Sequence, residues 1–126
     1  MDIGVGIEGS VWIIGTKKVG GGYNVLKWNG DDWKEIDGGA VRITVDNDGN
    51  PWVANENDDI YYRKNGDHWE HKHHHGGKAK DIGCGGDGKI WIVKPDSQVY
   101  KQQDKSDSEW EKIEGCTGVK IKAHQG

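Results

Sequence analysis

The chain has 126 residues, a formal net charge of -4 with both signs interspersed, only 33% hydrophobic residues and no Phe. This length suits one domain, the charge provides no basic field for nucleic acid, and no apolar run approaches the roughly 18 residues of a membrane span. The 21 Gly, seven Trp and four Tyr indicate many short strands with aromatic side chains in the core. The N-terminus lacks the layout of a secretory signal, so we expect a cytosolic protein or a trimmed secreted one.

The first predicted hairpin occupies residues 2–15, and close copies of it recur at residues 42–55 and 81–94. Each copy begins with alternating apolar and small or polar residues, as the two faces of a strand require. An acidic residue followed by Gly then supplies the positive φ of a short turn, in the pairs Glu8-Gly9, Asp48-Gly49 and Asp87-Gly88. The returning strand is apolar on both faces, which predicts that it is covered on both.

Two further strands complete each unit, and the last of them carries one Trp every time: Trp33, Trp69 and Trp110. A four-stranded antiparallel unit with a period of about 40 residues is typical of a β-propeller blade. We therefore expect an all-β chain with blades at about residues 2–41, 42–80 and 81–119. Residues 118–126 begin a further copy of the first strand. Trp12, Trp52 and Trp91 repeat at one position of the blade, which predicts a core role for them.

The sequence resembles the tectonin repeat over essentially the whole chain, at all three repeats, and two stretches illustrate this. The first is D-I-G-V-G-x-x-G-x-V-W-I-I-G followed by Y-x-V-x-x-W-N-G-x-x-W, and the second is A-V-R-I-T-V-D-N-D-G-N-P-W-V-A-N. This resemblance implies a β-propeller lectin family whose members bind glycans and bacterial lipopolysaccharide, some of them O-methylated sugars, in innate defence. The signature of WD repeats is absent.

The resemblance implies a ring of six blades, whereas this sequence holds three. Two interpretations stay open: two chains complete the ring as a homodimer, or the sequence is a fragment of a longer protein. Because a half ring exposes two apolar blade faces, we expect self-association in either case.

Sites generated by the repeat should lie in clefts between adjacent blades. Trp28 has no aromatic counterpart where Lys64 and Gln103 stand, so it is a candidate for stacking on a sugar or for contact between chains. The other candidate ligand-binding residues are polar or aromatic positions that differ between repeats: Asn29, Arg42, Asn55, Tyr62, Arg63 and Lys120. Arg42 and Lys120 would suit an acidic glycan or a lipid phosphate, and a surface salt bridge is the alternative.

Two further stretches resemble metal sites. His71, His73 and His75 would share one face of a strand and could bind a divalent metal, although adventitious or absent binding is the favoured interpretation. Asp46–Asn50 begins like a calcium loop, but Pro51 and Asn57 stand where Gly and a carboxylate are required, which favours a hairpin turn. No cofactor is expected.

Catalysis has little support, since no Ser elbow, no Cys/His pair and no phosphate loop before a helix occurs. Cys84 stands where the other repeats have Val5 and Val45 and is expected to be a small buried hydrophobe, with a bridge to Cys116 as the alternative. The sequence therefore predicts a non-catalytic, multivalent lectin. The alternative is a protein-interaction scaffold, or a propeller fragment that assembles with itself.

Overall fold

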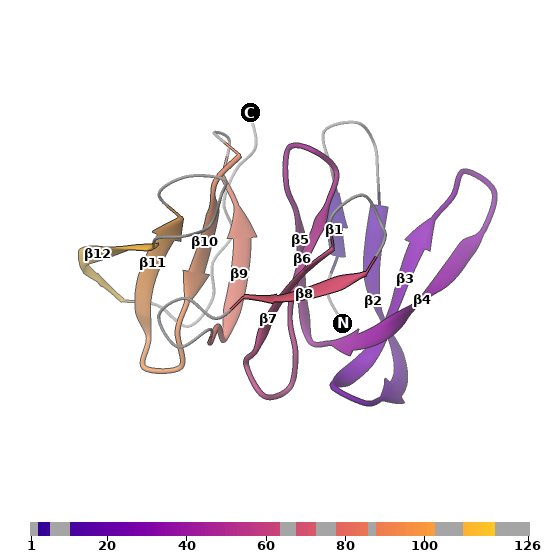
Figure 1. The fold of residues 1–126 in the computed structure, drawn as a ribbon, viewed down its shortest axis with the longest axis horizontal. Helices are drawn as coiled ribbons and strands as arrows, with labels where there is room; N and C mark the ends of the chain where they lie inside the picture. The colour runs from indigo at the N-terminus through magenta and orange to yellow at the C-terminus, as the bar shows by residue number, and fades with distance from the viewer. Residues whose placement is uncertain are drawn as a thin grey trace.

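A computed structural model of the chain describes residues 3–5, 11–63, 68–72, 78–85, 88–102 and 110–117. These residues form three four-stranded antiparallel sheets, each with its strands in chain order. The expected all-β fold of three blades is confirmed, and Figure 1 shows the three sheets side by side in the order of the chain.

The strands of the three blades have between three and nine residues. Blade 1 contains β1 (Ile3–Val5), β2 (Val11–Val19), β3 (Gly22–Trp28) and β4 (Trp33–Ala40). Blade 2 contains β5 (Arg42–Val45), β6 (Pro51–Ala54), β7 (Ile60–Arg63) and β8 (Trp69–Lys72). Blade 3 contains β9 (Asp81–Cys84), β10 (Ile90–Val93), β11 (Gln98–Gln102) and β12 (Trp110–Thr117).

The core lies between the blades, in two layers of buried apolar side chains. In the first layer, one face of blade 1 packs on blade 2 through Trp12, Ile14, Val25, Ala40, Ile43, Val45 and Val53. In the second, blade 2 packs on blade 3 through Trp52, Ala54, Ile60, Ala79, Ile82, Cys84, Ile90 and Ile92. The predicted core role is confirmed for Trp12 and Trp52, which are 1% and 3% exposed, while Trp91 is half-buried. Cys84 is buried in the second layer, as its position in the repeat predicts.

The acidic-Gly turns have the predicted backbone conformation where the structure describes them: Gly49 and Gly88 both have a φ of 82°. In the turn after β5, Oδ1 of Asp46 accepts hydrogen bonds from the amides of Asp48 and Asn50, and Oδ2 accepts one from the indole of Trp52. The Asp46 carboxylate thus closes the turn and accepts the indole hydrogen bond of a core Trp. These contacts confirm the hairpin interpretation of this stretch.

The strand register corrects one alignment made from the sequence. Trp28 pairs with Trp33, Arg63 with Trp69 and Gln102 with Trp110. Trp28 is therefore equivalent to Arg63 and Gln102, one residue before the Lys64 and Gln103 expected from the sequence. The connection that follows these residues differs in length between the blades, so only the strand pairing shows which residues are equivalent.

Candidate functional site

A cleft of about 280 Å³ lies between blade 1 and blade 2. Blade 1 contributes main chain from four glycines, and blade 2 contributes side chains from three successive strands and the turn after the first of them. The lining residues are Gly20, Gly21, Gly38, Gly39, Val53, Asn55, Tyr61 and Trp69.

The cleft is open because glycines stand where side chains would fill it. A Cβ added to Gly39 would lie 2.3 Å from the carbonyl oxygen of Gly20, so no larger residue fits this backbone. In blade 2 the equivalent position is Lys78, since Gly39 pairs with Asn24 and Lys78 forms the corresponding bridge with Asp59. The two junctions between blades therefore differ at this position, one having no side chain and the other a long one.

The inner rim of the cleft is a hairpin that reaches across to blade 2. Strand β2 has nine residues, whereas its counterpart β6 has four, and the extra length carries the β2–β3 turn over the neighbouring blade. There the carbonyl oxygen of Gly21 accepts a hydrogen bond of 2.8 Å from the amide of Glu56. Lys18 of the same hairpin forms an ion pair with the Glu56 carboxylate, and that bond raises the pKa of the lysine. The rim is thus tied to both blades.

The outer wall is the indole of Trp69, which is fixed from two sides. Its Nε1 donates a hydrogen bond of 2.7 Å to the carbonyl oxygen of Asp37 in blade 1. The guanidinium of Arg63 lies 5.3 Å from the ring and also forms an ion pair with the Asp37 carboxylate at 3.1 Å. This approach requires Gly38, because an added Cβ there would lie 2.7 Å from the Trp69 Nε1.

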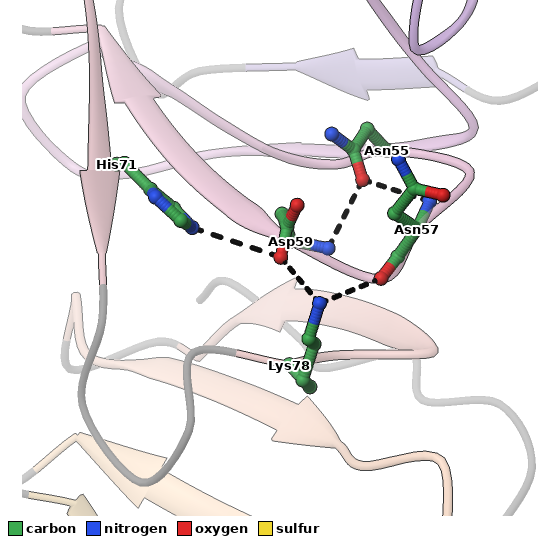
Figure 2. A network of polar contacts seen from close by, with 5 residues as sticks. All are labelled: Asn55, Asn57, Asp59, His71 and Lys78. Atoms are coloured by element: carbon green, nitrogen blue, oxygen red, sulfur yellow. Dashed lines mark hydrogen bonds and ion pairs between the residues drawn. The ribbon is translucent and has the colours of Figure 1, made fainter.

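Asn55 presents one polar group to the cleft. Its Oδ1 accepts hydrogen bonds from the amides of Asn57 and Asp59, at 2.9 and 3.0 Å, which fixes the side chain in a turn (Figure 2). Within the described part of the chain its Nδ2 makes no hydrogen bond, although the residue is only 9% exposed. The Asn55 amide is therefore a fixed donor at the cleft.

A network of charged residues lies beside the turn that holds Asn55, as Figure 2 shows. Lys78 donates to Asp59 at 2.6 Å and to the carbonyl oxygen of Asn57 at 3.1 Å. The hydrogen bond from Lys78 lowers the pKa of Asp59, and the nearby His71 adds to that effect, with its Nε2 at 3.7 Å from Oδ1. The imidazole of His71 also stacks on Tyr61, with ring centroids 4.8 Å apart. The network holds the Tyr61 ring in place beside the cleft.

The structure brings only two of the sequence candidates to this cleft. Asn55 lines it, and Arg63 lies behind Trp69. Trp28 and Asn29 lie at the other end of the β3–β4 ladder, where Trp28 pairs with Trp33. There Asn29 accepts hydrogen bonds from the amides of the two residues after Gly30.

The remaining candidates have structural partners or lie outside the described residues. Arg42 approaches Asp81 of blade 3 at 3.6 Å, the salt bridge that was the alternative for it. Tyr62 packs on Trp52 and accepts a hydrogen bond from Asn50, and burial, with the charge of Asp46, raises its pKa. His73, His75 and Lys120 lie outside the described residues, and the side chain of Cys116 is not described either.

Sequence reasoning missed most of the lining. Tyr61, Trp69 and the four glycines were not candidates, since the aromatic positions repeat and a glycine has no side chain to consider. One signal was present: Gly20-Gly21-Gly22 occurs in the first repeat alone. A glycine run at a predicted strand end indicates close approach of another backbone or of a ligand.

Two classes of feature are absent from the part of the chain that the structure describes. Those residues contain no cluster of three His, Cys, Asp or Glu side chains able to hold a metal ion. The same ranges include no helix with the length and hydropathy needed to cross a bilayer.

Comparison with known proteins gives the chain its family. The model of the family described as "Tectonin domain" matches residues 1–125. A curated relative, Tectonin-1 of Physarum polycephalum, is 37% identical over 59 residues, which are 47% of this chain and 25% of the relative. The match thus spans about a quarter of that relative's length. With three blades in the structure and a family match over nearly its whole length, the chain belongs to the tectonin domain family.

Proposed function

We propose that this chain binds carbohydrate, without catalysis, in the cleft between blade 1 and blade 2. The observation that carries the proposal is the placement of two aromatic rings, Tyr61 and Trp69, around one cleft with the Asn55 amide. Aromatic faces pack against the C–H face of a sugar ring, and an amide N–H donates to its hydroxyl groups. Both aromatic rings are already held by neighbours, so little order has to be gained on binding.

The size and lining of the cleft indicate the kind of sugar. A volume of about 280 Å³ lies at the lower end of the range for small-molecule pockets, which suits one sugar unit better than an extended chain. The four glycines contribute no side chain to the cleft, so the two aromatic rings are its main apolar surfaces. We therefore propose sugars with O-methyl groups, or the sugar part of bacterial lipopolysaccharide, as ligands. Several chains on one surface would raise the avidity of a weak single site.

A binding titration tests the proposal. Methylated monosaccharides and lipopolysaccharide fragments, chosen from a glycan array, are titrated against the protein by calorimetry. Asn55→Ala removes the amide donor and should weaken binding about two- to tenfold, the range for one hydrogen bond. Tyr61→Ala removes an aromatic wall and should weaken it further.

Trp28→Ala is the matched control, because it removes an exposed aromatic side chain at the other end of the β3–β4 ladder. This variant should bind as the wild type does. Thermal unfolding of every variant verifies that the fold is retained. The proposal fails if no glycan binds, or if binding survives both cleft substitutions unchanged.

A further inference from the structure

The charged side chains around the cleft between blades 1 and 2 are joined in pairs of opposite sign. Among the described residues the pairs are Lys18–Glu56 at the inner rim, Asp37–Arg63 at the outer wall and Lys78–Asp59 beside the Asn55 turn. The first two pairs each join blade 1 to blade 2. Because every pair combines one cation with one anion, the surroundings of the cleft carry no excess of positive charge from these residues.

The pair at the outer wall has its cation buried and its anion exposed. The side chain of Arg63 is 8% exposed, whereas that of Asp37 is 80% exposed. The guanidinium lies 5.3 Å from the Trp69 ring and is not part of the cleft lining. A molecule that approaches the outer wall from solvent therefore meets the Asp37 carboxylate, and the positive charge of Arg63 lies behind the indole.

The lining of the cleft also disfavours an anion. No Asp, Glu, Lys, Arg or His is among the described lining residues, and the two largest side chains are Tyr61 and Trp69. The face of an aromatic ring carries partial negative charge, so it attracts C–H groups and cations and repels anions. The Asn55 amide is a neutral donor, and hydrogen bonds from neutral donors are about half as strong as those from charged ones.

The cost of removing a ligand from water makes this charge distribution selective. A carboxylate or sulfate that enters the cleft loses part of its hydration, and this loss must be offset by a cation or by several N–H donors. The cations beside the cleft already have carboxylate partners, and the exposed Asp37 adds repulsion. A hydroxyl or methoxy group loses less hydration, and it needs only the aromatic faces and the Asn55 amide.

We infer that the cleft selects uncharged sugars and that Asp37 is a specificity-determining residue that disfavours acidic ones. This inference rests on the proposed function and narrows its class of ligand. The carboxylate of Asp37 neutralises Arg63 and places a negative charge at the exposed edge of the outer wall. Its main-chain carbonyl oxygen separately accepts the hydrogen bond from Trp69. The charge can therefore be removed by substitution while the acceptor for the indole remains.

Calorimetric titration with matched sugars measures this selectivity. Each neutral methyl glycoside is compared with the same sugar in which a carboxylate replaces the hydroxymethyl group, and with the same sugar carrying a sulfate ester on a ring hydroxyl. The wild type should bind the neutral sugar, and it should bind each charged derivative about tenfold more weakly.

Asp37→Asn tests the assigned residue. It removes the negative charge beside Arg63 and should narrow the preference for the neutral sugar about two- to fivefold. The narrowing should be larger at low than at high ionic strength, which a change in shape alone would not produce. Glu35→Gln is the matched control, because Glu35 is exposed on the same strand β4 and does not line the cleft. This variant should keep the wild-type preference, and thermal unfolding verifies the fold of both.

The outcomes separate this inference from the proposed function. If the wild type binds neither neutral nor charged sugars, the proposed function fails and the inference fails with it. If an acidic derivative binds as tightly as its neutral parent, or if Asp37→Asn leaves the preference unchanged, sugar binding stands and the inference alone is wrong.

Discussion

The indole Nε1 of Trp52 lies 3.1 Å from Oδ2 of Asp46, inside the core between blades 2 and 3. Trp12 occupies the same position in blade 1 and is as deeply buried, but its Nε1 has no hydrogen-bond partner among the described residues. Repetition of the blade has thus reproduced the Trp without reproducing its acceptor.

This difference predicts unequal costs for one substitution. Trp52→Phe leaves the Asp46 oxygen without its donor and should lower the free energy of unfolding by about 1–3 kcal/mol beyond the loss of ring volume. Trp12→Phe loses the same volume but also removes an unpaired buried donor, so its total cost should be smaller. Urea unfolding of both variants checks this, and equal costs would show that the Asp46 hydrogen bond contributes no net stability.

The pair of Asp59 and Lys78 predicts a dependence of stability on pH. The hydrogen bond from Lys78 lowers the pKa of Asp59 in the folded chain. Such a carboxyl group stabilises the fold above its unfolded pKa of about 3.9, and the contribution is lost as the pH falls through the lower folded value.

The free energy of unfolding of the wild type should therefore fall more steeply below about pH 4 than that of Asp59→Asn. Urea unfolding between pH 2 and 6 measures both curves. Lys78→Met, which removes the partner and keeps the carboxyl group, should flatten the same region. Parallel curves for all three proteins would contradict the assignment.

The backbone at Gly38 predicts a cost for adding one methyl group. Gly38 has a φ of 99°, and an added Cβ would meet the Trp69 Nε1 at 2.7 Å. Gly30 is the matched control, because its φ is 103° but no atom lies within 4 Å of an added Cβ. Gly30→Ala should cost only the backbone strain, about 1–3 kcal/mol, while Gly38→Ala should cost more and should weaken ligand binding at the cleft. Thermal unfolding compares the two, and an equal loss would mean that Trp69 moves aside freely.

The burial of Cys84 predicts tolerance of a similar side chain. Cys84 is 2% exposed and occupies the position of Val45, which is 1% exposed. Cys84→Val should change the free energy of unfolding by less than about 1.5 kcal/mol, because the equivalent position of blade 2 already holds a buried Val. Cys84→Ala leaves a small cavity and should be the less stable of the two. Denaturant unfolding under reducing conditions checks the order.

The sequence predicted the blades because their signals are local. Alternation in residues 42–45, the Asp48-Gly49 turn and the apolar run around Trp52 each specify a piece of one hairpin, and the repeat confirms each piece elsewhere. The counterpart of Trp28 in blade 2 was placed one residue too late, at Lys64. The pairs Trp28–Trp33 and Arg63–Trp69 show that it is Arg63, and strand pairing cannot be read from one sequence.

The cleft could not be predicted in the same way. It forms where blade 1 and blade 2 meet, and half of its lining is glycine main chain. Whether Asn55 faces a ligand or a neighbour depends on which strand of another blade lies beside it. The Oδ1 of Asn55 accepts hydrogen bonds within its own turn, whereas its Nδ2 makes none there. The sequence alone does not tell these two atoms apart.

The exchange of Gly39 for Lys78 has a consequence for how such a chain can diversify. Both residues occupy one position of the repeat, and the two packing layers both consist of one Trp with small and aliphatic side chains. A recess between two blades of this repeat therefore depends on main chain that approaches too closely for any residue but glycine, so one junction can hold a recess while the next does not.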